Sequence, residues 1–380
     1  MIVGGEHDQR IHLRKLAASS LEAVCNLTEQ VCLIPAPSFA ECQRAEFVAK
    51  QFEARGLRAE IDEIGNVIVR RKGAGSAKSL LLAAHTDTVF PIDTEITVRR
   101  ENGQMIGPAI GDNSLAVATL IELASILDEA QVETPGDLLL VANVGEEGLG
   151  NLRGIRAVCD RFGDELGGVI AIEGHNVGRV THGAVGSKRI RVSVFGPGGH
   201  SWGAFGQPSA IHELGLIIAD MSKLRVPEDP KTTFNVGLIE GGVSVNTIAP
   251  WASAVIDMRS IDPAALNRLS SEVVQIVEQR QSNQISIEIE VLGERPAGWI
   301  DSSARIVQTA SAILRELGIE PILNASSTDA NIPISRGIPA ICIGLTRGSG
   351  AHRVEESIEI APIEQGMLQL ALLVSAFPVE

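Results

Sequence analysis

Residues 79–87, SLLLAAHTD, run from an uncharged, mostly apolar segment into three polar residues. A run too apolar to face solvent on either side predicts a strand buried in a parallel sheet. The pattern recurs in DLLLVANV (137–144), GGVIAIE (167–173) and PAICIG (339–344). Apolar residues at helical spacing accompany these strands at 12–31, 40–55, 114–128, 302–316 and 362–377. We therefore predict an α/β unit with a mixed, largely parallel sheet flanked by helices.

Between these segments the pattern changes. KRIRVSVFG (188–196) and ISIEIEV (285–291) alternate polar and apolar residues, which predicts strands with one face in water. Further strands are expected near 234–239 and 251–258, and helices at 207–223 and 262–280. This order indicates an inserted α+β unit, an antiparallel sheet with two helices. The expected division is 1–186 and 294–380 for the first unit and 187–293 for the insertion.

Composition and charge narrow the possible partners. The 380 residues carry a net charge of −15, which repels phosphate backbones, so no nucleic acid partner is expected. The first residues lack a cationic lead into an apolar segment, and no apolar run approaches the roughly 18 residues of a membrane span. The five cysteines show no CxxC spacing, which favours free thiols. We expect a cytoplasmic protein without a membrane partner.

Polar residues of metal-ligand type follow all four apolar strands. Strand ends of an open α/β sheet share one crevice, so these side chains can converge there. They are His85 and Asp87, Glu146 and Glu147, Glu173, and, after a glycine-rich loop, His352, with Asp112 before a helix. Two histidines and three carboxylates suffice for two divalent cations with one bridging carboxylate. Asp87 can orient His85, and one acid of the Glu146–Glu147 pair is left to act as a base.

Each of these residues has a simpler interpretation when taken alone. Asp112 before a helix could be an N-cap, the Glu146–Glu147 pair a solvated loop, and His352 a surface residue. Solvation does not explain why such groups follow four runs that are each too apolar for a surface. The combination therefore favours a metal site.

Eight segments of the chain also resemble a known family, the co-catalytic metallopeptidases that include the aminoacylases, carboxypeptidase G, peptidase T, carnosinase-type dipeptidases and succinyl-diaminopimelate desuccinylase. The resemblance spans nearly the whole chain. It is carried by AAHTDTVFP (83–91), GPAIGDNSLAVATLI (107–121), NVGEEGLGNLRG (143–154), AIEG (171–174), GPGGHSWGAFGQPSAI (196–211), VSVNTIAPWASAVIDMRS (243–260), SSTDANIPISRGIPAICIG (326–344) and GAHRVEE (350–356).

The resemblance implies a zinc-exopeptidase-like catalytic domain holding two divalent ions per chain, zinc above all, with manganese or cobalt as alternatives. One ion would be bound by His85, Asp112 and Glu173. The other would be bound by Asp112, Glu147 and His352. Glu146 would then be the general base, and Asp87 would keep its orienting role.

The resemblance further implies that the inserted unit is a lid and the contact of a homodimer. Its His200 would reach the partner's site and polarise the scissile carbonyl, while Asn246 and Arg259 would bind the substrate. Other readings stay open, because Arg259 could pair with Asp257, and His200 and Asn246 could support turns. Trp202 and Arg353 depart from the common family pattern, and SSTDAN (326–331) with RGIPAICIG (336–344) is most like peptidase T.

These observations predict a metal-dependent hydrolase that cleaves a peptide or amide bond in a small, carboxylate-bearing substrate, such as a short peptide. A metal-bridging water and the base Glu146 would carry the reaction. An N-acyl-amino-acid deacylase or carbamoyl amidohydrolase with the same centre is an alternative. An inactive, metal-binding paralogue is an alternative from another class.

Overall fold

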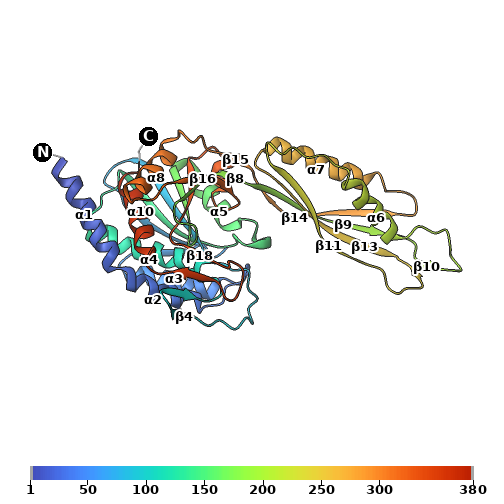
Figure 1. The fold of residues 1–380 in the computed structure, drawn as a ribbon, viewed down its shortest axis with the longest axis horizontal. Coiled ribbons are helices and arrows are strands. Elements are labelled where there is room, and N and C mark those ends of the chain that lie inside the picture. The colour runs from blue at the N-terminus through green and yellow to red at the C-terminus, as the bar shows by residue number, and fades with distance from the viewer. Residues whose placement is uncertain (1–2, 378–380) are drawn as a thin grey trace. The chain divides into compact units, whose positions relative to one another are not determined.

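The computed structural model describes residues 3–377 and divides the chain into two compact units (Figure 1). The first unit contains the chain up to Gly183 and again from Trp299 onward. The second unit is the insertion Ala184–Gly298, coloured from light green to orange in Figure 1. Each unit has its own hydrophobic core.

The first unit is built on a nine-stranded mixed sheet. Its order is β1 (Ala59–Ile61), β2 (Val67–Arg71), β6 (Gly136–Asn143), β3 (Ala77–His85), β7 (Leu166–Glu173), β17 (Ala340–Gly344), β8 (Arg179–Ala184) and β15 (Gly298–Trp299), with β16 (Ile322–Ser326) paired to β8. The four central strands, β6, β3, β7 and β17, run parallel, whereas β1, β2 and β8 pair antiparallel. The central strands are the four runs that the sequence identified, because strands covered on both faces must be apolar throughout.

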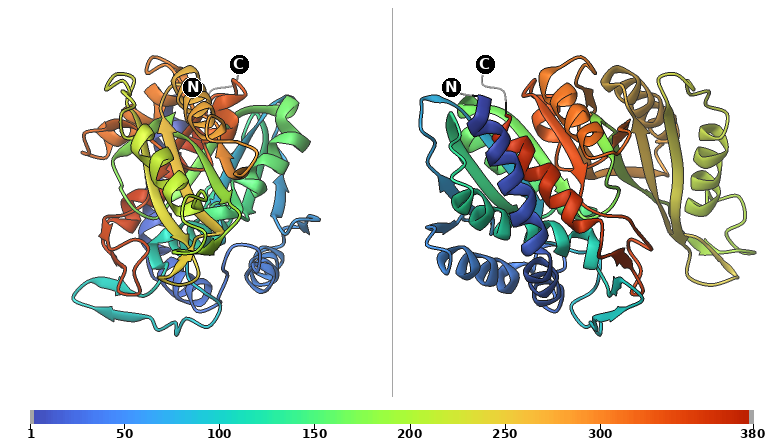
Figure 2. Two further views of the ribbon diagram at one scale, coloured as in Figure 1. Left: turned by 90° about the vertical axis from the view of Figure 1, so that its right-hand side faces the viewer. Right: turned by 60° about the vertical axis from the view of Figure 1, so that its left-hand side comes forward.

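Helices cover both faces of this sheet. One face packs against α1 (Val3–Ser19), α2 (Leu21–Cys32), α3 (Cys42–Glu53), α4 (Leu115–Glu129), α8 (Arg305–Glu316) and α10 (Ile363–Ser375) in a single core. Figure 2 shows α1 in blue and α10 in red side by side. On the side of β2 that carries Ile68 and Arg70 lies Phe162, at the end of α5 (Arg153–Phe162). Helix α5 contacts the short α9 (Asn331–Ser335). The predicted α/β fold class is confirmed.

Three details differ from the sequence-based expectation. The helix expected at 12–31 is two helices, α1 and α2, which meet at Ser20. Helix α5 was not expected, since RGIRAVCDRF contains a glycine and four charged residues in ten. The segment Ile110–Glu129 is long and apolar enough to cross a membrane, but most of it is buried inside the structure. Its apolar character therefore fits a helix in the core of the first unit.

A small antiparallel sheet joins distant parts of the first unit. It contains β4 (Arg99–Glu101), β5 (Gln104–Ile106), β18 (Gly348–Ser349) and β19 (Ser357–Glu359). Because β19 pairs with β5, the loop 350–356 is held beside the segment that leads into the turn Ile110–Ser114. This pairing positions the loop 350–356 and the turn Ile110–Ser114 next to each other.

The second unit is a four-stranded antiparallel sheet with two helices, as the fold class predicted. The sheet order is β11 (Thr232–Gly241), β13 (Trp251–Ser260), β9 (Gly186–Phe195) and β14 (Ser286–Arg295). Helices α6 (Ala210–Met221) and α7 (Pro263–Glu278) share one core with it. Asp262 begins α7 by accepting a hydrogen bond from the Ala265 amide at 2.6 Å, with Pro263 in the first turn. A separate short ladder pairs β10 (Gly199–His200) with β12 (Thr247–Ile248).

Candidate metal centre

The polar residues lie where the central strands of the first unit end. Strand β3 ends at His85 and β7 at Glu173, while Glu146 and Glu147 follow β6. Because β6, β3 and β7 are parallel neighbours, their carboxyl ends meet at one edge of the sheet. Asp112 reaches this edge from the turn that precedes α4. The strand order thus explains why residues far apart in the sequence form one cluster.

Asp112 lies at the centre of this cluster. Its Oδ1 is 3.2 Å from Nε2 of His85, and its Oδ2 is 3.2 Å from Nε2 of His352. Glu173 lies 3.7 Å from His85, and Glu147 lies 3.3 Å from His352, on either side of Asp112. The five residues therefore form two groups that share one carboxylate.

Three groups of ligand atoms in the described part of the chain lie close enough together to hold a metal ion. They are His85–Asp112–Glu173, Asp112–Glu147–His352 and His85–Glu146–Glu147, each with its ligand atoms within 4.8 Å of one another. The first two are the sets that the family resemblance assigns to two ions. Imidazole nitrogen and carboxylate oxygen are the donors that zinc and manganese accept, so the donor chemistry fits a two-metal centre.

Asp87 is a fully buried carboxylate beneath the cluster. It accepts hydrogen bonds from the backbone amides of Glu146 and Glu147, both at 2.9 Å, and from the Ser38 hydroxyl at 2.6 Å. Nδ1 of His85 lies 3.1 Å from the backbone oxygen of Asp87 and 3.6 Å from its carboxylate. Asp87 therefore ties the end of β3 to the loop that carries the two glutamates.

The electrostatics of the cluster favour positive charge at its centre. Burial raises the pKa of Asp87, but hydrogen bonds to His85, Ser38 and the Glu147 amide lower it to about 2. The hydrogen bond to Asp112 raises the pKa of His352 to about 9. Burial and the nearby Asp112 charge raise the pKa of Glu147 to about 7. Imidazolium protons or metal ions can both supply the positive charge that these carboxylates need.

Glu146 is 7% exposed and belongs to the same edge of the sheet. A carboxylate oxygen of Glu146 lies within 4.8 Å of ligand atoms of His85 and Glu147. Glu146 is not a member of the two groups centred on Asp112.

The other predicted site residues, His200, Asn246 and Arg259, belong to the second unit. Exposed His200 accepts hydrogen bonds at Nδ1 from the amides of Trp202 and Gly203 at 3.2 and 3.3 Å. Asn246 accepts a hydrogen bond from the Ser244 hydroxyl at 3.0 Å. His200 and Asn246 thus make local turn contacts in this structure.

Arg259 donates from Nε to Asp257 at 2.7 Å, with 40% of its side chain exposed. Only one of its nitrogens is used in this ion pair, so the guanidinium can still offer other donors. Both departures from the family pattern lie on the surface, Trp202 with 88% of its area exposed and Arg353 in the exposed loop beside His352.

Several residues that hold the cluster were not identified from the sequence. Asn113 bonds the backbone on both sides of Glu173, with 2.8 Å to the Ile172 oxygen and 3.0 Å to the Gly174 amide. Fully buried Asp329 accepts from Asn143 at 2.8 Å, and burial raises the pKa of Asp329 to about 7. Glu356 also accepts a hydrogen bond from the Asp112 amide, and His175 contacts Glu356 in turn. Periodicity and spacing carry no signal for these contacts, because each joins segments that only the fold brings together.

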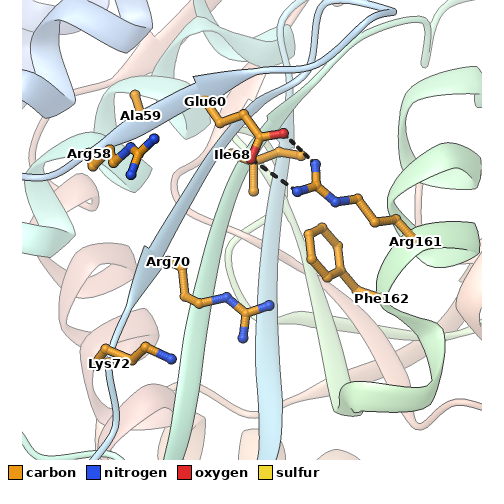
Figure 3. Close-up of a pocket in the computed structure, with 8 residues that line it drawn as sticks. All are labelled: Arg58, Ala59, Glu60, Ile68, Arg70, Lys72, Arg161 and Phe162. Carbon is orange, nitrogen blue, oxygen red and sulfur yellow. Dashed lines mark hydrogen bonds and ion pairs between the residues drawn. The ribbon is translucent and has the colours of Figure 1, made fainter.

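A cavity of about 610 Å³ lies away from the metal-ligand cluster, near the β1 edge of the sheet (Figure 3). It is lined by Arg58, Ala59, Glu60, Ile68, Arg70, Lys72, Arg161 and Phe162. Most of its cations already pair with carboxylates: Arg161 with Glu60, Arg70 with Asp137 and Glu165, and Lys72 with Asp137. Its charges are thus nearly balanced, and it contains no residue of the metal-ligand cluster.

Known proteins resemble this chain over most of its length. The family described as Peptidase family M20/M25/M40 matches residues 81–376. Succinyl-diaminopimelate desuccinylase of Corynebacterium glutamicum is 27% identical over 348 residues, covering 89% of this chain and 92% of that protein.

Two solved structures share the fold at lower identity. Aminopeptidase PepT from Bacillus cereus has a TM-score of 0.79 at 20% identity, covering 93% of this chain and 98% of that one. A Bacillus subtilis protein described as a dinuclear metal binding peptidase has a TM-score of 0.70 at 15% identity, covering 94% and 98%. The expected family resemblance is confirmed.

Proposed function

Because the chain belongs to peptidase family M20/M25/M40 and is a hydrolase of peptide or amide bonds, we propose that it cleaves such a bond in a small substrate with a free carboxylate. The preferred substrate class is a short peptide. The observation that carries the proposal is the position of Asp112, with one oxygen 3.2 Å from His85 and the other 3.2 Å from His352. A carboxylate placed in this way can serve two ions at once.

The proposed ligands are His85, Asp112 and Glu173 for one ion and Asp112, Glu147 and His352 for the other. Zinc is the preferred metal, with manganese or cobalt as alternatives, because mixed carboxylate and imidazole donors accept all three. When bound, the ions would lower the pKa of water and polarise the scissile carbonyl. Asp87 orients the segment that carries these ligands through its bonds to the Glu146 and Glu147 amides.

Glu146 is the proposed general base. Its carboxylate would take a proton from the attacking water and then donate that proton to the leaving nitrogen. Its position at the strand-end edge, within 4.8 Å of ligand atoms of His85 and Glu147, supports this role. An inactive paralogue would be expected to lack the base or a ligand, and this chain retains Glu146 and all five ligand candidates.

Arg259 and Asn246 are the proposed contacts for the substrate. A guanidinium can bind a carboxylate through two parallel hydrogen bonds, which orients the substrate as well as holding it. An N-acyl-amino-acid deacylase or carbamoyl amidohydrolase would use the same residues. The similarity to a succinyl-diaminopimelate desuccinylase keeps the deacylase alternative open.

The second unit is proposed as a lid and as the contact of a homodimer. Strand β11 forms one edge of its sheet and exposes Leu238 by 68% and Ile239 by 62%. Val243 and Val245, in the loop after β11, are exposed by 72% and 104%. An edge strand with such apolar side chains is suited to pairing with a second copy. In the dimer, His200 of each chain would act at the partner's metal centre.

A substrate panel tests the proposed activity. Metal-depleted protein would be loaded with zinc, manganese or cobalt and assayed on dipeptides, tripeptides, N-acyl amino acids and N-carbamoyl amino acids. Cleavage of short peptides is expected, and faster turnover of an acylated amino acid would favour the deacylase alternative. No turnover of any substrate by protein that holds two ions would favour the inactive paralogue. A cytoplasmic location is part of the proposal, supported by five free cysteines.

A further inference from the structure

Glu356 is a carboxylate with no exposed surface, in the loop that also carries His352. Its Oε1 accepts hydrogen bonds from the backbone amides of Gly111 and Asp112, each at 2.8 Å. Nε2 of His175 lies 2.7 Å from the same oxygen. One buried oxygen therefore contacts the turn that carries the shared carboxylate and a residue that closely follows Glu173.

These contacts restrain the backbone at Asp112. Two successive amides that point at one carboxylate oxygen fix the orientation of the peptide between them, and such charge-assisted bonds are stronger than neutral ones. The packing is also close, because a Cβ at Gly111 would lie 2.5 Å from His175 Nε2 and 2.8 Å from Glu356 Oε1. A side chain at position 111 would therefore meet His175, Ile358 and Glu356.

Asp112 is held on its other side by a separate contact. Asn113 bonds to the Ile172 oxygen and the Gly174 amide, which ties the turn to the end of β7. Glu356 ties the same turn to the loop that carries His352. Its backbone oxygen also accepts a hydrogen bond, at 2.9 Å, from the amide of Gly107, which precedes the turn. The two ties lead toward the two proposed ion sites, Asn113 toward Glu173 and Glu356 toward His352.

We infer that Glu356, together with His175, is a positioning residue that holds the Asp112 carboxylate where it can bind two ions simultaneously. The inference rests on the proposed function, since it concerns the same metal centre. It assigns Glu356 no contact with the ions or the substrate. Without Glu356, Asp112 could still bind one ion together with His85 and Glu173. The position of its second oxygen relative to His352 would no longer be fixed.

The test is a titration of metal-depleted protein with Co²⁺. Calorimetry measures the affinity for each ion, and visible absorption reports the coordination of the bound Co²⁺. Wild type is expected to bind two ions. Glu356→Ala should lower the affinity for the second ion by about 10- to 100-fold, as for other residues that orient metal ligands. It should also alter the absorption spectrum of the bound ion. Glu356→Gln keeps an acceptor oxygen without the charge, so a smaller but measurable loss of second-ion affinity is expected.

The matched control is Glu122→Gln, which makes the same change in an ion pair with Arg55 that is outside the metal-ligand cluster. It should bind both ions as wild type does. If both Glu356 variants bind two ions with wild-type affinity and spectrum, the inference is wrong, even if their melting temperatures fall. If Glu356→Ala does not fold, the glutamine variant decides between these outcomes in the same way. Failure of wild type to bind any ion would instead refute the proposed function.

Discussion

The Oδ2 oxygen of Asp112 lies 3.2 Å from Nε2 of His352, although the turn and the loop that carry them are distant in the sequence. Oδ1 of the same carboxylate lies 3.2 Å from Nε2 of His85. One side chain thus faces an imidazole on each of its two oxygens. This arrangement defines the two-metal proposal and leads to the following predictions.

Purified protein is expected to bind two divalent ions per chain, because five ligand candidates with one shared carboxylate complete two groups. Removing the ions with a chelator should abolish hydrolysis and lower the melting temperature, since ions bound only to the folded state stabilise it by about 2.7 kcal/mol at 100 times their dissociation constant. Elemental analysis and thermal unfolding measure both effects. Absence of bound metal at every loading would rule out the mechanism.

Glu146→Gln should lower kcat by about 10²- to 10⁴-fold, because the amide keeps the shape but cannot accept a proton. Ion content should remain at the wild-type value, since Glu146 is not among the proposed ligands. Glu165→Gln is the matched control, as its carboxylate pairs with Arg70 in a half-exposed ion pair. Near-normal turnover by the Glu146 variant would show that another group is the base.

Asp87→Asn should destabilise the metal-free protein by about 1–3 kcal/mol, because an asparagine offers one acceptor oxygen to two buried amides and leaves a donor unsatisfied. Ion affinity should also fall by about 10- to 100-fold. Ser38→Ala removes the hydroxyl contacts to Asp87 at 2.6 Å and to the backbone oxygen of Glu147 at 3.2 Å, and should cost about 0.5–1.5 kcal/mol. Urea unfolding measures both variants, and equal stability of Asp87→Asn and wild type would contradict the assigned role.

Arg259→Lys should raise KM for carboxylate substrates by about tenfold or more with little change in kcat, since the fork geometry is lost while a charge remains. Substrates with an amidated carboxylate should show a much smaller change. Arg189→Lys is the matched control, because Arg189 pairs with the other oxygen of Asp257 at 3.0 Å. An equal rise in KM for amidated substrates would mean that Arg259 does not bind the carboxylate.

Mixing two inactive variants tests whether His200 acts on the partner's site. His200→Ala lacks the proposed oxyanion donor and Glu146→Gln lacks the base, so each should be nearly inactive. A mixed dimer with action across subunits contains one site with both defects and one site with neither. Refolded mixtures should then recover up to roughly a quarter of wild-type activity under random pairing.

If His200 serves its own chain, every site in the mixture keeps one defect and mixing restores nothing. Subunit exchange would be confirmed separately by isolating dimers that carry two different tags. Absence of recovery in such dimers would reject action across subunits, while leaving the metal chemistry unaffected.

Much of the fold could be predicted from the sequence, because strands buried on both faces of a sheet must be apolar along their whole length. The four apolar runs became β3, β6, β7 and β17, and the alternating segments became strands of the second unit. Helix α5 escaped prediction because its glycine and charged residues obscure a short amphipathic pattern. The division of 12–31 into two helices at Ser20 also escaped prediction, since the apolar spacing continues across it.

The sequence by itself determined the fold class, because apolar runs are a local property of the chain, and the family, because its motifs follow one another along the chain. The metal ligands stay a prediction that rests on the histidines and acids at the ends of those runs. Only the tertiary structure decided how those residues are held. Asp87 beneath two amides, Asn113 beside Glu173 and Glu356 behind Asp112 are contacts between segments far apart in the chain. Hydrogen bonds act over about 3 Å, so their partners are set by folded geometry and leave no spacing in the sequence.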